Sequence, residues 1–91
     1  MAEEERKDYE VLLEKRALKQ LQFLDKRTAP RVSGALKDLR EGFSARLDIK
    51  KLKGMNNRYR VRVGDYRILF ELRAKREIVV FAILPREKAY E

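Results

Sequence analysis

The chain has 91 residues, with 23 Lys or Arg, 15 Asp or Glu, and neither cysteine nor histidine. This length predicts a single domain over residues 1–91, with one modest core and with its sites on the surface. The lack of cysteine and histidine excludes disulfides, thiolate chemistry and the commonest zinc ligands, so we expect no metal and no cofactor. No apolar run approaches the roughly 20 residues of a membrane span, and we expect a cytoplasmic protein without membrane contact.

The positive charge is concentrated in one third of the chain. Residues 46–76 hold eleven Lys or Arg against three Asp or Glu, whereas the rest of the sequence holds twelve of each sign. The net charge of +8 therefore belongs to this segment. Such a concentration is typical of a surface that binds phosphates, because a merely solvated surface intersperses the two signs.

The first elements are a predicted strand and a predicted helix. The segment Tyr9-Glu10-Val11-Leu12-Leu13 indicates a short strand. Helical spacing follows over Glu14–Lys26, where three leucines share one stripe: Leu18, Leu21 and Leu24. The stripe is best explained as core, because a chain this short needs its helices to cover a sheet.

A second helix is predicted after Thr28, which is a good N-cap residue. Pro30 suits its first turn, and Gly42 ends it. Its apolar residues recur at i, i+4 and i+7: Val32, Leu36 and Leu39. The segment Phe43–Asn57 has no clear period and is interpreted as a basic connector with some extended structure.

The rest of the chain predicts an antiparallel meander. Apolar and arginine residues alternate over residues 58–63, which is the pattern of a half-buried strand. Gly64-Asp65 suits a two-residue type II′ turn, and a second such turn at Lys75-Arg76 leads into Ile78–Leu84. The predicted fold is α+β, with two N-terminal helices on one face of a mainly antiparallel four-stranded sheet in the order β-α-α-β-β-β.

The first turn fixes which residues share a face. With only Gly64 and Asp65 in the loop, Val61 faces Ile68 in the core, Tyr59 faces Phe70, and Arg62 faces Arg67 on the other side. Like charges directly opposite each other destabilise a sheet. Arg60 lies on the same face, about 6.6 Å along the strand from Arg62. Folding alone does not require this cluster.

The second turn extends the prediction to the last strand. It places Val79, Phe81 and Ile83 in the core, opposite Leu72, Phe70 and Ile68. Leu84 then lies opposite Arg67, and Arg86 continues toward the same side. The arginines would border an apolar floor that can accept a nucleobase or a partner helix, formed by Leu69, Val80 and Ala82.

Two interpretations of these arginines remain open. Alternating arginines on an exposed strand also discourage edge pairing and keep a sheet soluble. The opposed Arg62 and Arg67 favour a functional role, because guanidinium groups match phosphate geometry and stay charged. We therefore predict a nucleic-acid-binding surface, extended on the basic segment by four further positions: Lys50, Lys51, Lys53 and Arg58.

Several motifs in the second half occur together: Leu52-Lys53-Gly54-Met55, the run YRVRVGDYRI of residues 59–68, Pro85-Arg86-Glu87, and Tyr90. They resemble the RelE toxins of the RelE/ParE superfamily, and the order of elements extends the resemblance to nearly the whole chain. The resemblance implies a type II toxin that is a metal-independent endoribonuclease, cleaves mRNA in the ribosomal A site and inhibits translation. It also implies as partners the ribosome with its mRNA and a cognate antitoxin that wraps around the toxin, with scope for a higher-order toxin–antitoxin assembly.

The resemblance assigns catalytic roles to five positions: Arg60, Arg62, Arg67, Arg86 and Tyr90. In the family the reaction resembles attack of a ribose 2′-hydroxyl on the adjacent phosphate, where preorganised guanidinium groups stabilise the developing charge. Several relatives have lysine in place of Arg60 and Arg62, and arginine is a poor general base. The base stays open between Tyr90, if arginines lower its pKa, and Glu87.

Two other functions are compatible with the sequence. A ParE-like protein would inhibit DNA gyrase by protein contact and would not need the cluster of four arginines with Tyr90. A non-catalytic nucleic-acid-binding relative would use arginines only to neutralise phosphates. Single-strand binders usually expose aromatic rings for stacking, whereas Tyr59 and Phe70 are predicted to point inward.

Overall fold

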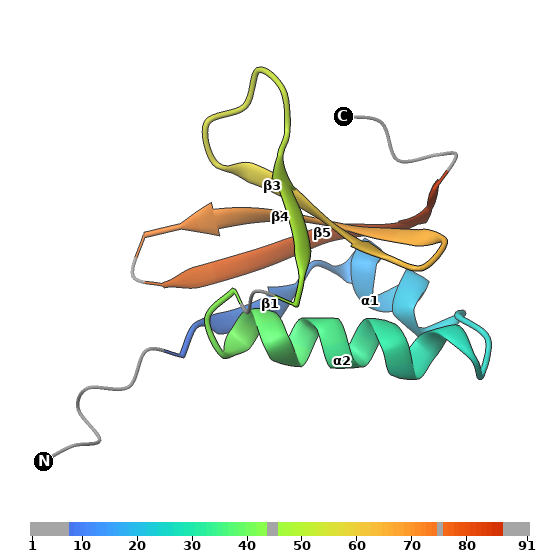
Figure 1. The fold of residues 1–91 in the computed structure, drawn as a ribbon. Helices are drawn as coiled ribbons and strands as arrows, with labels where there is room; N and C mark the ends of the chain where they lie inside the picture. The colour runs from blue at the N-terminus through green and yellow to red at the C-terminus, as the bar shows by residue number, and fades with distance from the viewer. Residues whose placement is uncertain (1–7, 44–45, 75, 87–91) are drawn as a thin grey trace, which may run out of the picture.

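The computed structural model describes residues 8–43, 46–74 and 76–86, which form a sheet covered on one face by two helices (Figure 1). The elements are β1 Glu10–Leu13, α1 Lys15–Gln22, α2 Thr28–Arg40, β2 Asp48–Lys51, β3 Arg58–Val63, β4 Tyr66–Arg73 and β5 Glu77–Pro85. The strands lie in the order β1-β5-β4-β3-β2, and only β1 and β5 pair in parallel. The predicted α+β architecture is confirmed. None of the described helices is long and apolar enough to cross a membrane.

The sheet has five strands, whereas four were predicted. The additional strand is β2, which lies within the segment predicted as a connector and pairs with β3 at the edge of the sheet. Only Ile49 of this strand is partly buried, and its other three residues are exposed. A four-residue edge strand with one apolar residue is too short to show a period in the sequence.

The core lies between the helices and the inner face of the central strands. Val61, Ile68 and Phe70 are fully buried there against Val32 and Leu39 of α2. Aromatic contacts extend the core, because the ring of Tyr59 stacks on that of Phe70 with centroids 5.5 Å apart. The inward positions predicted for Tyr59 and Phe70 are therefore confirmed.

Helix α1 is shorter than predicted and uses a different stripe. It ends at Gln22, and Leu18 is 45% exposed, so the prediction that Leu18 belongs to the core was wrong. The buried residue is Ala17, whose small side chain allows the helix to lie close to β5. Leu21 and Leu24 pack against the core as predicted.

The start of α2 also differs from the prediction. Thr28 is the first residue of the helix rather than its N-cap, and its backbone N–H donates a 2.7 Å hydrogen bond to the carboxylate of Asp25, which precedes the helix. This hydrogen bond lowers the pKa of Asp25 below its usual value of 3.8. At the other end, Gly42 adopts φ 109° beyond Arg40, which agrees with its predicted role in ending the helix.

The β3–β4 hairpin has the predicted register. Val61 pairs with Ile68 and Arg62 with Arg67, and Val63 and Tyr66 flank the two-residue turn. Gly64 has φ 58°, and Asp65 does not have a positive φ, which is the pattern of a type II′ turn.

The β4–β5 hairpin corrects the prediction. Its last pair joins Arg73 to Glu77, so the turn spans three residues rather than two, and Phe70 pairs with Val80 instead of Phe81. A β-bulge then restores the expected register, in which Arg67 faces Leu84. The core consequently contains Ile78 and Val80 in place of Val79 and Phe81. A bulge inserts one unpaired residue, which alternation along a single strand does not reveal.

Candidate nucleic-acid interface

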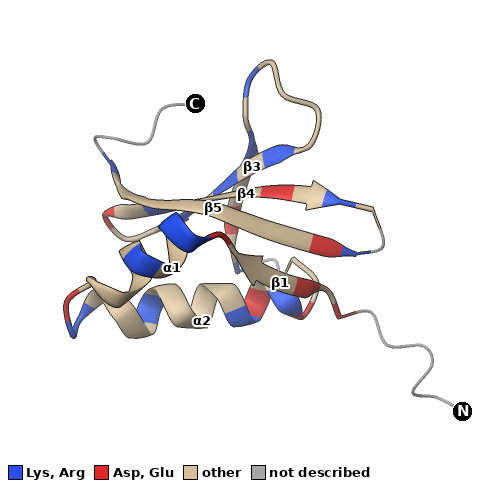
Figure 2. Ribbon diagram, turned by 180° about the vertical axis from the view of Figure 1, so that it is seen from behind, with Lys and Arg blue, Asp and Glu red and all other residues tan. Residues whose placement is uncertain are grey.

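Arginines from the two central hairpin strands lie on the sheet face opposite the helices, and Lys and Arg mark much of β3 in Figure 2. We call this the arginine face and define it by Arg60 and Arg62 of β3, Arg67 of β4, and Arg86 after β5. The face exists because residues alternate along each strand, so the positions of β3 that alternate with Tyr59, Val61 and Val63 must point outward.

Arg62 and Arg67 are the central pair of this face. They are direct cross-strand partners, and Cβ atoms in such pairs lie about 4.5–5.5 Å apart. Arg62 is exposed, and Arg67 is half-buried. Guanidinium groups on directly opposed residues repel each other in the free protein, and both gain from an anion that they can contact together.

Arg86 is held next to the β3–β4 turn. Its backbone N–H donates a 2.7 Å hydrogen bond to the carbonyl oxygen of Asp65, two residues before Arg67. Pro85 precedes it as the cross-strand partner of Tyr66. The structure thus places Arg86 beside the turn that joins the strands of Arg62 and Arg67, although Arg86 is distant from both in sequence.

Arg60 differs from the other arginines because it is only 8% exposed. Its Nη1 donates a 3.1 Å hydrogen bond to the backbone carbonyl oxygen of Asp48 and lies 3.3 Å from the Asp48 carboxylate. Asp48 is also the cross-strand partner of Arg62. The Asp48 carboxylate therefore holds the Arg60 side chain in position on the arginine face.

Asp48 was not predicted as a site residue from the sequence. It is one of only three acidic residues in the basic segment 46–76, which was a usable signal. Its position beside Arg60 depends on β2, which the sequence pattern did not reveal.

The four further basic residues predicted to bind RNA separate into different environments. Lys50 pairs with Arg60 and shares the arginine face, whereas Lys51 pairs with Tyr59 and lies on the opposite face. Lys53 follows β2 and is exposed. The guanidinium carbon of Arg58 lies 4.7 Å from the centroid of the Phe81 ring, in a cation–π contact.

The predicted apolar floor is partly correct. Leu69 and Ala82 pair across β4 and β5 and are both buried beside the arginines. Val80 was wrongly assigned to this floor, because the shifted register turns it into the core. Its place on the outer face is taken by Phe81, over which Arg58 lies.

Some predicted residues are outside the described part of the chain. Tyr90 and Glu87, the two candidate bases, lie in residues 87–91, which the structure does not describe. Among residues 8–43, 46–74 and 76–86, no group of three acidic side chains is placed to hold a metal ion.

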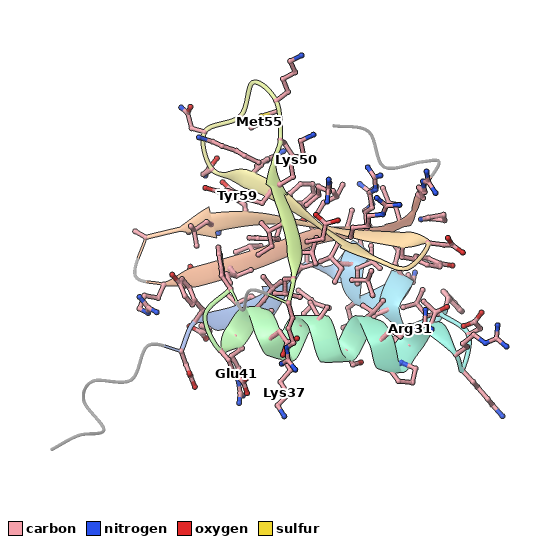
Figure 3. The ribbon with its side chains drawn as sticks, viewed as in Figure 1. Arg31, Lys37, Glu41, Lys50, Met55 and Tyr59 are labelled. Carbon is pink, nitrogen blue, oxygen red and sulfur yellow. The ribbon has the colours of Figure 1, made fainter. Side chains whose placement is uncertain are left out.

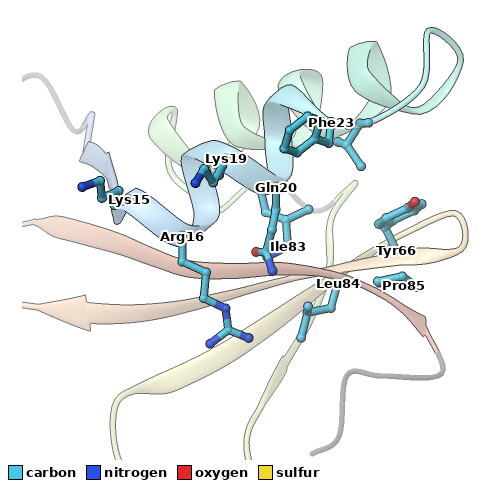
Figure 4. A pocket seen from close by; sticks show the side chains of 10 residues that line it. Lys15, Arg16, Lys19, Gln20, Phe23, Tyr66, Ile83, Leu84 and Pro85 are labelled. Atoms are coloured by element: carbon cyan, nitrogen blue, oxygen red, sulfur yellow. The ribbon is translucent and has the colours of Figure 1, made fainter.

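A groove that the sequence did not predict lies between α1 and the end of β5 (Figure 4). Its volume is about 730 Å³, and Leu84 and Pro85 form part of its apolar lining. Phe23 at its margin is 82% exposed. Three cations of α1 also line the groove: Lys15, Arg16 and Lys19. The groove adjoins the arginine face, because Leu84 is the cross-strand partner of Arg67.

Comparison with known proteins identifies a family. The model of the "ParE toxin of type II toxin-antitoxin system, parDE" matches residues 11–90. A curated relative, Toxin RelE3 of Methanocaldococcus jannaschii, is 42% identical over 59 residues, which are 65% of this chain and 59% of that protein. This match therefore spans less than two thirds of the relative's length.

Two solved structures are similar over most of their length. The toxin chain matched in the archaeal RelE–RelB complex of Pyrococcus horikoshii is 31% identical with a TM-score of 0.75, and the match covers 90% of this chain and 99% of that one. A chain of the RelB–RelE antitoxin–toxin complex of Methanococcus jannaschii is 32% identical with a TM-score of 0.72, at 84% and 91% coverage. The protein therefore belongs to the RelE family of toxins, within the RelE/ParE superfamily of type II toxin–antitoxin systems.

Proposed function

We propose that this toxin is an endoribonuclease that cleaves mRNA in the ribosomal A site and so inhibits translation. The observation that carries the proposal is the pairing of Arg62 with Arg67, near Arg86 and the apolar floor of Leu69 and Ala82. This arrangement is costly for folding and favourable for binding a phosphate. Membership of the RelE family supports an RNA-directed role for it.

The proposed reaction is an internal transfer within the RNA. The ribose 2′-oxygen forms a bond to the adjacent phosphorus, the bond from phosphorus to the 5′-oxygen breaks, and the 2′-hydroxyl proton passes to a base while the leaving 5′-oxygen gains a proton. Negative charge grows on the non-bridging oxygens in the transition state. Arg62, Arg67 and Arg86 would stabilise this charge in place of a metal ion.

Arg60 contributes in a second way in this proposal. Because it is nearly buried and paired with the Asp48 carboxylate, which offsets its charge, its proposed role is to hold β2 and β3 in fixed positions beneath the site. Tyr90 and Glu87 remain the proposed candidates for the proton acceptor. An arginine is a poor base, so none of the four arginines is assigned this step.

The ribosome would supply much of the remaining catalysis. A substrate that is held in a bent, in-line geometry reacts with fewer catalytic groups than a free strand. We therefore expect little cleavage of free RNA and strong stimulation by ribosomes with an empty A site.

A cognate antitoxin is the second proposed partner. The similar archaeal structures are complexes of RelE with RelB. The groove beside α1 has the apolar lining and cationic residues that suit a segment with apolar and acidic side chains. An antitoxin that covers this groove would also reach the neighbouring arginine face.

A gyrase-directed function is the second candidate, because the matched family model is described as a ParE toxin. Such a toxin would inhibit DNA supercoiling by protein contact. If the toxin inhibits gyrase, substitutions in the arginine face should not reduce its activity. Such substitutions therefore distinguish the two functions.

The test is to incubate the purified toxin with a defined mRNA, with and without programmed ribosomes that have an empty A site. A parallel reaction measures supercoiling by gyrase. We expect cleavage only with ribosomes and unchanged supercoiling. Intact mRNA in every reaction together with loss of supercoiling would replace the proposal by the gyrase-directed function.

A further inference from the structure

The loop between β2 and β3 projects from the sheet on the side away from the helices (Figure 1). We call Leu52–Asn57 the β2–β3 arm. Figure 3 shows Met55 on this arm and Lys37 of α2 on the far side of the molecule. Residues 49–63, which include the arm, contain six Lys or Arg and no Asp or Glu. The arm is thus a protruding element within the most basic part of the chain.

The arm is held in one conformation by hydrogen bonds at its tip and its base. Met55 donates through its backbone N–H to the carbonyl oxygen of Leu52, and Gly54 has φ 78°, as a type II turn requires. Leu72 of β4 donates to the carbonyl oxygen of Asn57 at 2.8 Å. The Asn57 side chain also donates to Glu71 at 2.9 Å. These bonds preorganise the arm, which reduces the entropy lost when it binds a partner.

The two apolar side chains of the arm have different positions. Leu52 is 9% exposed and anchors the arm, whereas Met55 is 46% exposed and is not part of the hydrophobic core. Lys53, two residues before the methionine, is also exposed. An unbranched, polarizable methionine beside a lysine can fill a shallow, irregular surface while the lysine meets a phosphate.

The arm is too far from the central pair of the arginine face, Arg62 and Arg67, to contact the same phosphate. Arg58, where the arm joins β3, is four residues from Arg62, which corresponds to about 13 Å along the strand. The arm tip at Met55 lies beyond Arg58. A ligand of the arm is therefore a different part of the RNA from the bond that is cleaved.

We infer that the β2–β3 arm docks on folded ribosomal RNA, with Lys53 on the phosphates and Met55 against exposed base or sugar edges. This inference rests on the proposed function, since it names a surface that delivers the toxin to its substrate. Folded RNA fits better than a single strand, because Leu52–Asn57 contains no aromatic ring on which free bases could stack. The charge of the segment argues against a basic protein surface as the partner.

Site-specific crosslinking tests the inference. The chain has no cysteine, so Met55→Cys can be labelled uniquely with a thiol-reactive photocrosslinker. Leu18→Cys is the matched control, because Leu18 is exposed to the same degree, at 45% against 46%. On ribosomes with an empty A site we expect Met55→Cys to crosslink to ribosomal RNA and Leu18→Cys to crosslink several-fold less. Crosslinks of Met55→Cys only to mRNA, to a ribosomal protein or to nothing would overturn the inference.

Charge reversal supplies an independent measurement. Lys53→Glu should weaken binding to these ribosomes about tenfold and lower its salt dependence. Lys37→Glu makes the same charge change on the exposed face of α2. It should change neither the affinity for ribosomes nor the salt dependence of binding. Equal weakening by both variants would mean a general charge effect and would contradict a specific arm contact.

The outcome is separable from the proposed catalysis. Crosslinking and binding are repeated with Arg67→Ala, which should cleave at least about 100-fold more slowly. An arm-dependent crosslink to ribosomal RNA without any cleavage by the wild type would support the arm and reject the endoribonuclease. Cleavage by the wild type without this crosslink would support the endoribonuclease and reject the arm inference. A wild type that binds no ribosomes would also reject the arm inference.

Discussion

The two faces of the β3–β4 hairpin are built by alternate residues of the same strands, yet the inner face is apolar and the outer face carries arginines. The inner face buries Val61, Ile68 and Phe70 completely. The outer face places Arg62 opposite Arg67 and leaves Arg62 exposed. The comparison teaches that one face stabilises the fold, whereas the other holds repelling charges that the fold does not need. Substitutions on the two faces should therefore have opposite effects on stability and activity.

The largest effect is expected on the inner face. Val61→Asp places a carboxylate in the core, where an unpaired charge costs several kcal/mol of a net stability of about 5–15 kcal/mol. We expect the variant to be unfolded when circular dichroism and thermal unfolding are measured. Leu18→Asp, at an exposed leucine, is the control and should fold. A folded Val61→Asp variant would contradict the assignment of the inner face.

On the outer face, Arg67→Ala should slow ribosome-dependent mRNA cleavage about 100-fold or more, because one charge-stabilising donor of the transition state is lost. Its free energy of unfolding should change by less than about 0.5 kcal/mol or rise, since Arg62 no longer faces a like charge. Single-turnover cleavage and urea unfolding measure the two effects. Arg73→Ala, at the far end of the same strand, removes an arginine away from the cluster and should retain activity within twofold.

A smaller effect on the cleavage rate is expected from substitution of Asp48, whose carboxylate pairs with Arg60. Asp48→Asn keeps the shape of the side chain and removes the charge that faces Arg60 and Arg62. Looser positioning of Arg60 should reduce the cleavage rate about tenfold and leave ribosome binding unchanged. Asp48→Glu should restore part of the rate. Equal rates for wild type and Asp48→Asn would show that this ion pair has no positioning role.

The smallest effect on stability is expected at the N-terminal end of α2, which is outside both faces. The folded-state pKa of Asp25 is below 3.8 because the carboxylate accepts a hydrogen bond from Thr28. A lowered folded pKa means that this stabilisation is present above about pH 4 and is lost as the pH falls through the folded value. Asp25→Ala should lower the melting temperature slightly at pH 7, and the difference from wild type should shrink in acid. Asn at position 25 can still cap and should remove the pH dependence.

The part of the site that depends on the β3–β4 turn was predictable from sequence. A two-residue Gly64-Asp65 turn permits one register, and that register opposes Arg62 and Arg67. The position of Arg86 near Arg67 followed less directly, because the bulge in β5 corrects the error of the three-residue turn before it. The turn is one residue longer than predicted, and the bulge adds one unpaired residue to β5. The two deviations cancel from the pair of Leu69 and Ala82 onward.

Other features could not be predicted because they depend on tertiary contacts. Asp48 reaches Arg60 only because the four-residue strand β2 pairs at the sheet edge. The choice of Ala17 over Leu18 as the buried residue follows from the close approach of α1 to β5. Gln20 accepts a 2.7 Å hydrogen bond from the backbone N–H of Ile83, just past the bulge, and this contact has no local sequence signal.

The most direct test of the central claim is a paired measurement on one preparation of Arg67→Ala. Its ribosome-dependent cleavage of a defined mRNA and its free energy of unfolding are compared with those of the wild type. We predict that cleavage falls at least 100-fold while stability stays equal or increases. A variant that unfolds, or a folded variant that cleaves at the wild-type rate, would contradict the assignment of the outer face to catalysis.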